Sequence, residues 1–192
     1  AAAAAEREAR KPVKVVLSEA GNFPTDLHIA SGAVGCVDRA ELRQLLASDM
    51  AGEPQQLGDT YWLGKQLGKW ATLLPVAEQA GELAVVEECT RRIRMALENF
   101  LMARDVTGVP KQAEKGVFAY DPAWGSLIGY PASYGSDDQL NDHHFHYGYF
   151  LRAAGELARR DAGWAEQWAP MLKLLVRDIA SADRADPMFP FL

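Results

Sequence analysis

Three of the chain's four histidines lie in one short segment, residues 141–149, together with a carboxylate and two tyrosines. If this segment is helical, Asp142 and His146 lie one turn apart, at positions i and i+4. His143 and Tyr147 have the same spacing. Carboxyl, imidazole and phenol groups gathered at one helix start can transfer protons, bind a metal ion or bind hydroxyl groups. We therefore take residues 141–149 as the candidate site.

The residue types leave three interpretations of this segment open. In the first it is structural, with Asp142 as the helix N-cap, because Asp is favoured there. In the second, Asp142, His143 and His146 bind a metal ion, although such sites normally recruit a further ligand and the remaining histidine, His28, has no such neighbours. In the third, it belongs to a carbohydrate site with acid and base catalysis. Four aromatic residues shortly upstream favour the third interpretation: Tyr120, Trp124, Tyr130 and Tyr134.

The elements that would position these side chains are predicted to be mainly helices. A first helix is expected to begin with a capping box formed by Asp38 and Glu41. Pro75 and Pro170 are expected to kink or interrupt two of the later helices. Apolar residues recur at helical spacing in four further segments: residues 61–81, 82–104, 142–160 and 163–182.

A long connection, residues 105–141, separates the first two of these four helices from the last two. Connections of this length without secondary structure are uncommon in compact domains and are usually functional. A short strand is expected within it at residues 116–120, and another at residues 12–21. The fold class is therefore mainly α, with minor strands and with helices 61–81 and 82–104 as antiparallel neighbours.

Charge, hydropathy and cysteine usage exclude several classes of protein. Lys and Arg total 20 against 26 Asp and Glu, a net charge of −6, so we expect no nucleic-acid partner. No apolar stretch approaches the roughly 18 residues that span a bilayer, so we expect no membrane partner. Cys36 and Cys89 lack metal-site spacing and are expected to be buried, unpaired side chains.

Residues 120–161 resemble the core signature of glycoside hydrolase family 81, the endo-β-1,3-glucanases, in its bacterial form. The segment reads YDPAWGSLIGYPASYGSDDQLNDHHFHYGYFLRAAGELARRD. Its LNDHHFHYGY run is long and unusual in composition, which makes the resemblance specific. Residues 60–81 and 175–192 are similar to flanking segments of the same family, so the similarity covers residues 38–192.

The resemblance implies a catalytic domain built as an (α/α)6 barrel of helix pairs, preceded in the full enzyme by a β-sandwich. We accordingly expect residues 38–192 to be the N-terminal part of such a barrel, truncated at its C-terminal side. Residues 1–37 are expected to be an irregular N-terminal segment or interdomain linker. Helices of an incomplete barrel expose apolar inner faces, so self-association is also expected.

The resemblance also implies endo-acting, inverting hydrolysis of β-1,3-glucan such as laminarin, curdlan or fungal wall glucan, without a cofactor or metal. By position, Asp142 matches the family's general acid, which protonates the departing oxygen. The family's general base is a Glu that follows a Gly-His-Ser-Trp-Ala motif, a segment beyond residue 192. The alternative function is a non-catalytic, glucan-binding remnant. The substrate class implies an extracellular location, although the chain shows no targeting segment.

Inverting enzymes need two carboxyls roughly 6.5–9.5 Å apart. Within the chain, Asp121, Asp137 and Asp138 are the acidic residues near enough in sequence to supply the second. His146 is expected to be neutral or to face substrate hydroxyls, because a protonated imidazole one turn from Asp142 would lower the pKa of that acid. The expected substrate-binding residues are Tyr120, Asp121, Trp124, Tyr134, Asp137, His143, His144, His146 and Tyr147.

Overall fold

The computed structural model describes residues 39–52 and 58–190. The chain divides into two compact units, residues 1–41 and 42–192, and the architecture below is that of the second. The expected strand at residues 12–21, together with His28, Cys36 and Asp38, lies outside the described residues.

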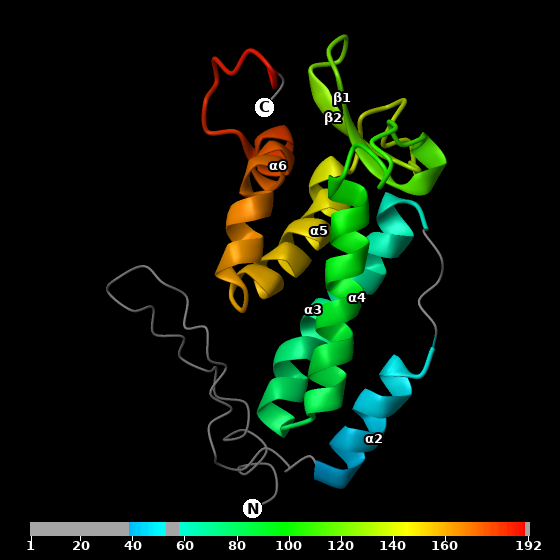
Figure 1. The fold of residues 1–192 in the computed structure, drawn as a ribbon. Coiled ribbons are helices and arrows are strands. Elements are labelled where there is room, and N and C mark those ends of the chain that lie inside the picture. The colour runs from blue at the N-terminus through cyan, green and yellow to red at the C-terminus, as the bar shows by residue number, and fades with distance from the viewer. Residues whose placement is uncertain (1–38, 53–57, 191–192) are drawn as a thin grey trace, which may run out of the picture. The chain divides into compact units, whose positions relative to one another are not determined.

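The described part of the chain is mainly helical, as predicted, with one small β-hairpin (Figure 1). None of its helices is long and apolar enough to cross a bilayer. Its strands are β1 (Val117–Asp121) and β2 (Ser126–Tyr130), which pair antiparallel after a 3-10 turn at Ala113–Lys115. Its α-helices are α2 (Arg39–Met50), α3 (Thr60–Ala80), α4 (Leu83–Leu101), α5 (His143–Ala158) and α6 (Ala162–Ala180).

The long helices are arranged as two hairpin pairs, α3 with α4 and α5 with α6. Gly81 ends α3 in the left-handed conformation, with φ 76°, and its N–H bonds back to carbonyls of the last turn. Asp161 starts α6 by accepting a hydrogen bond from the backbone N–H of Trp164 at 2.9 Å. The two pairs meet where α5 packs against α3 and, less extensively, against α4.

Both helices that contain an internal proline continue through it. Pro75 lies within α3 and Pro170 within α6, so the predicted interruptions do not occur. In α3, buried Leu74 and Ala77 flank the proline. Burial of the apolar face on both sides of Pro75 offsets the backbone hydrogen bond that the proline removes.

The core forms between the facing stripes of the helices and the inner face of the hairpin. Cys89 lies fully buried within it, as expected, and burial raises the pKa of its thiol to about 11. The largest side chains with almost no exposure are aromatic or aliphatic, namely Tyr147, Phe100, Phe150, Leu67, Leu74, Ile93 and Leu97.

Tyr147 joins α5 to the hairpin. Its phenol oxygen accepts a hydrogen bond from the backbone N–H of Gly129 at 2.9 Å and donates one to the carbonyl of Leu127 at 2.8 Å. The Phe118 ring of β1 packs edge-on against it, with centroids 5.1 Å apart. This contact fixes the position of β2 relative to the start of α5.

Close packing of α3 on α5 depends on glycine. A Cβ at Gly64 would lie 2.9 Å from Cδ2 of Tyr149 and 3.3 Å from its Cβ. Overpacking of this kind costs about 1–3 kcal/mol. We therefore expect Gly64→Ala to unfold at a lower urea concentration than the parent protein.

Gly155→Ala is the matched control, because Gly155 is an exposed helical glycine of α5 whose added Cβ would meet nothing within 4 Å. Both variants gain the helix propensity of alanine, about 1 kcal/mol. The free energy of unfolding should therefore be about 1–3 kcal/mol lower for Gly64→Ala than for Gly155→Ala. Equal values would contradict the close approach of α5 at Gly64.

Candidate active site

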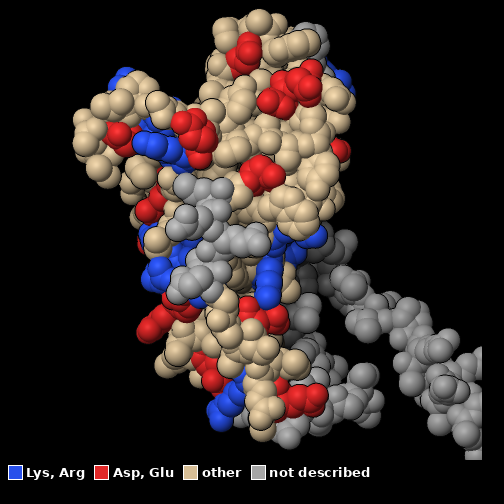
Figure 2. Space-filling model, turned by 90° about the vertical axis from the view of Figure 1, so that its right-hand side faces the viewer, with Lys and Arg blue, Asp and Glu red and all other residues tan. Residues whose placement is uncertain are grey.

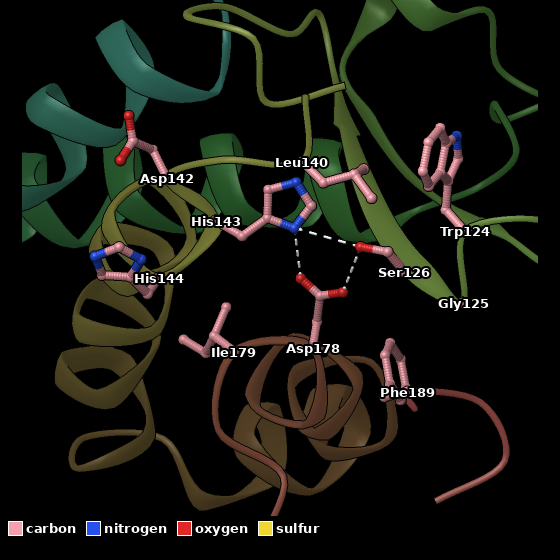
Figure 3. Close-up of a pocket in the computed structure, with 10 residues that line it drawn as sticks. All are labelled: Trp124, Gly125, Ser126, Leu140, Asp142, His143, His144, Asp178, Ile179 and Phe189. Atoms are coloured by element: carbon pink, nitrogen blue, oxygen red, sulfur yellow. Dashed lines mark hydrogen bonds and ion pairs between the residues drawn. The ribbon is translucent and has the colours of Figure 1, made fainter. Parts of the chain in front are cut away.

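A cavity of about 340 Å³ lies where the N-terminus of α5 meets the hairpin and the end of α6 (Figure 3). Four of the residues predicted from the sequence line it: Trp124, Asp142, His143 and His144. In the view of Figure 3, Asp142 and Trp124 lie on opposite sides of the His143 ring. The other lining residues are Gly125, Ser126, Leu140, Asp178, Ile179 and Phe189.

Asp142 starts α5 with its backbone rather than with its side chain. Its carbonyl accepts hydrogen bonds from the N–H groups of Phe145 and His146, at 3.0 and 2.9 Å. Its φ of 57° is left-handed, and its carboxylate makes no capping hydrogen bond. N-cap residues that use their side chain normally have extended backbone. Asp142 is thus the N-cap residue of α5, as the structural interpretation predicts, but its side chain does not cap the helix, and its exposed carboxylate is available to a ligand.

His143 is held on both sides of its ring. Nδ1 donates a hydrogen bond to Oδ2 of Asp178 at 2.8 Å, and Nε2 donates one to the carbonyl of Ser136 at 2.6 Å. Because both partners are acceptors, the arrangement suits the doubly protonated imidazolium. Burial lowers the pKa of His143, but these two hydrogen bonds and the Asp178 charge outweigh it, so the pKa is raised above 6.5.

The buried carboxylate of Asp178 accepts hydrogen bonds from three donors. Its Oδ1 accepts hydrogen bonds from the hydroxyl of Ser126 at 2.9 Å and from the backbone N–H of Leu127 at 2.7 Å. With His143 on Oδ2, the carboxylate joins β2, α5 and α6. The sequence analysis missed Asp178, although a charged residue three positions after buried Leu175, on an otherwise apolar helix face, was a usable signal.

His146 is buried like His143 but in the opposite electrostatic setting. Its Nδ1 lies 2.9 Å from the hydroxyl of Thr60, the first residue of α3. Burial lowers the pKa of His146, despite the nearby charges of Asp142 and Asp59. The neutral imidazole expected from the sequence is thus favoured, while the ring faces Thr60 and not the cavity.

Several predicted site residues lie outside the cavity. The hydroxyl of Tyr120 donates to the carbonyl of Met188 at 2.6 Å. Asp121 accepts a hydrogen bond from the N–H of Ala123 at 2.8 Å, which shapes the turn between β1 and β2. Tyr147, fully buried, bonds the hairpin backbone. Asp137 is half-buried and does not line the cavity.

Tyr134 belongs to a separate aromatic group at the start of α3 and α5. Its ring is 58% exposed and lies edge-on to Tyr61, with centroids 4.8 Å apart. Tyr61 in turn stacks on Phe145 at 6.0 Å and meets Trp62 edge-on at 5.3 Å. Exposed rings therefore lie on two sides of the helix start that carries Asp142.

The metal interpretation finds no support in the arrangement of the described residues. Within residues 39–52 and 58–190, no group of three His, Cys, Asp or Glu side chains could hold a metal ion. His143 and His146 face different partners, Asp178 and Thr60.

The raised pKa of His143 makes its contribution to stability depend on pH. A group whose pKa is higher in the folded state stabilises fully below its unfolded value, here 6.5, and loses this contribution as pH rises through the folded value. We expect the free energy of unfolding of the parent protein to exceed that of His143→Gln by more at about pH 6 than at about pH 9. Urea titrations at the two pH values measure this difference, and the groups common to both proteins cancel. A difference independent of pH would contradict the ion pair.

Comparison with known proteins identifies the family of this chain. Residues 32–192 match the glycosyl hydrolase family 81 C-terminal domain. A glucan endo-1,3-beta-D-glucosidase of Acetivibrio thermocellus is 50% identical over 137 residues, 70% of this chain and 17% of that protein. A glucan endo-1,3-beta-D-glucosidase of Thermobifida fusca is 40% identical over 192 residues, 95% of this chain and 24% of that protein.

A solved structure agrees with these relatives. It is a glycoside hydrolase family 81 protein from Clostridium thermocellum, in a mutant form, with a TM-score of 0.72 and 44% identity. The match covers 82% of this chain and 22% of that one. The chain thus spans about a quarter or less of the length of the proteins it resembles. On this match of sequence and fold, the chain belongs to glycoside hydrolase family 81.

Proposed function

We propose that this chain supplies the proton donor and part of the sugar-binding surface of a domain that cleaves internal bonds of β-1,3-glucan. The observation that carries the proposal is the placement of Asp142, an exposed carboxylate on the wall of a cavity that also holds the Trp124 ring. Trp124 is 49% exposed and offers a face on which a sugar can stack. The relatives at 40% and 50% identity are both named for this activity.

In the proposed reaction, Asp142 gives its proton to the glycosidic oxygen as the bond from that oxygen to C1 breaks. Water attacks C1 from the opposite face and passes its proton to a second carboxylate, so the anomeric configuration inverts. Asp178 is a poor choice for that second group, because its two oxygens already accept three hydrogen bonds. We therefore place the general base outside this chain.

The helix arrangement is compatible with an (α/α)6 barrel, in which inner helices lie side by side and outer helices return the chain. In the second unit, α3 and α5 pack together, while α4 and α6 pair with them. The N-termini of α3 and α5 lie close together, because the hydroxyl of Thr60, the first residue of α3, is 2.9 Å from Nδ1 of His146 in the first turn of α5. We propose that α3–α4 and α5–α6 are two successive pairs of such a barrel.

The chemistry of the surface suits an uncharged polymer. Figure 2 shows acidic and basic side chains close together over the lower part of one face, and above them mostly uncharged surface with separate acidic patches. A glucan carries no charge, so it is bound by stacking and by hydrogen bonds to hydroxyls. Because such a polymer is too large to enter a cell, we place the reaction outside it.

Asp142→Asn tests the assignment of the acid. In the intact protein acting on linear β-1,3-glucan, we expect this variant to lower kcat by about 10²–10⁴-fold, the usual worth of general acid catalysis. Release of reducing ends measures the rate, and thermal melting confirms the fold. Glu87→Gln, an exposed variant on α4 outside the cavity, should behave like the parent protein. If Asp142→Asn keeps most of the activity, the acid is another residue.

Trp124→Ala tests the stacking surface. Sedimentation of the 192-residue chain with insoluble β-1,3-glucan measures binding separately from cleavage. Loss of the ring should weaken binding about twofold to twelvefold, the equivalent of about 0.5–1.5 kcal/mol, and Trp124→Phe should restore most of it. Equal binding by the parent protein, Trp124→Ala and Trp124→Phe would show that the Trp124 ring does not bind the glucan.

The same mixture, assayed for reducing ends, tests whether the general base lies within the chain. Binding without cleavage agrees with a base supplied from outside the chain. Clear cleavage would place the base within it, with Asp121 or Asp137 as the first candidates.

A further inference from the structure

We infer that Asp178 is a positioning residue for Asp142, which it holds in place through the ring of His143. The inference rests on the proposed function, because it takes Asp142 as the proton donor. It goes further by giving a role to a buried carboxylate that the reaction itself does not use. Asp178 is 8% exposed and lines the same cavity as Asp142 (Figure 3).

The first argument is the convergence of three elements on this carboxylate. Asp178 belongs to α6, Ser126 and Leu127 begin β2, and His143 is the first residue of α5. All three donors lie within 2.9 Å of its oxygens. Removal of the carboxylate would leave buried donors without an acceptor. The hydrogen bonds that join β2, α5 and α6 at this point would be lost together.

The second argument is the closed loop that contains Asp142. The hydrogen bond from Nε2 of His143 to the carbonyl of Ser136 joins residues seven positions apart and so closes the loop 136–143. The opposite side of the same ring is held by Asp178. Because the ring is held from both sides, these two bonds restrict the backbone of Asp142, the preceding residue.

The third argument is backbone strain inside this loop. Leu140 and Asp142 have φ values of 53° and 57°, in the left-handed region that non-glycine residues rarely adopt. Such conformations persist only where surrounding contacts impose them. The start of α5 holds the carbonyl of Asp142 through the N–H groups of Phe145 and His146. The carbonyl of Ser136 and the carboxylate of Asp178 hold His143, the next residue.

Asp178→Asn and Asp178→Ala separate positioning from direct chemistry. Asparagine can still accept from Ser126 and Leu127, and its amide can donate to a neutral His143, so the geometry survives without the charge. Alanine removes all three contacts. In the intact protein we expect Asp178→Ala to lower kcat on linear β-1,3-glucan about 10–100-fold with little change in KM, the scale of a small misplacement. Asp178→Asn should stay within about fivefold of the parent protein.

A second substrate shows whether the loss concerns the proton donor. The dinitrophenyl glycoside of a β-1,3-gluco-oligosaccharide has a leaving group that departs without a proton. Displacement of Asp142 should therefore matter much less for this substrate, and Asp178→Ala should lose under about threefold in kcat on it. A general loss of folded structure would lower both rates alike.

Asp161→Ala is the matched control. Asp161 caps the other end of α6 and pairs with Arg94 at 2.7 Å, so its loss weakens the helix away from the cavity. It should lower the melting temperature and leave both values of kcat unchanged. His143→Gln gives a second route to the same displacement where Asp178→Ala does not fold, and should show the same selective loss.

Three results would overturn the inference: full activity of Asp178→Ala, equal loss on the two substrates, or an Asp178→Asn variant as inactive as Asp178→Ala. The last of these would make Asp178 a direct participant in the reaction. Failure of the proposed function looks different, because the parent protein would then not cleave β-1,3-glucan or Asp142→Asn would remain active.

Discussion

The buried ion pair between His143 and Asp178 is the constraint on which the site depends. Burying either group alone is costly, and a buried pair is favourable only when its remaining hydrogen-bonding groups are also satisfied. Asp178 meets this condition by drawing on Ser126 and Leu127, and His143 by donating to the carbonyl of Ser136. The pair therefore forms only when β2, α5, α6 and the loop before α5 are all in place, and the cavity forms with them.

Helical periodicity was sufficient to predict the long helices of this fold, because each buries one apolar face. A kink or an interruption was expected at Pro75 and Pro170, and the interruption does not occur, because α3 and α6 continue through the prolines. In α3, burial of Leu74 and Ala77 on both sides of the proline outweighs one lost hydrogen bond. The strand at residues 116–120 was also predicted and appears as β1. Its partner β2 was not, because the segment SLIGY is short and its burial comes from Tyr147 and Asp178 beneath it.

The sequence predicted a candidate site at residues 141–149 but not the arrangement of its side chains. Composition alone singled out residues 141–149, and the structure puts Asp142, His143 and His144 from this segment in one cavity. His143 and His146, about one turn apart on α5, nevertheless have pKa values shifted in opposite directions. The pKa of His143 is raised by an aspartate 35 positions later, while burial lowers that of His146, which faces a threonine 86 positions earlier. Contacts at such separations follow from the packing of helices and not from any local pattern.

Asp142 begins α5 without using its carboxylate to cap the helix. A side-chain cap would hold the carboxylate against backbone N–H groups, which stabilise its charged form and so oppose a proton donor. At Asp142 the carbonyl accepts the first hydrogen bonds of α5, the backbone is left-handed, and the side chain is left exposed. The cost is a strained conformation, and the energy that maintains it has to come from elsewhere in the fold. The ring of His143 is in the right place to supply it, since His143 directly follows Asp142 and its ring is held by the carboxylate of Asp178 on one side and the carbonyl of Ser136 on the other.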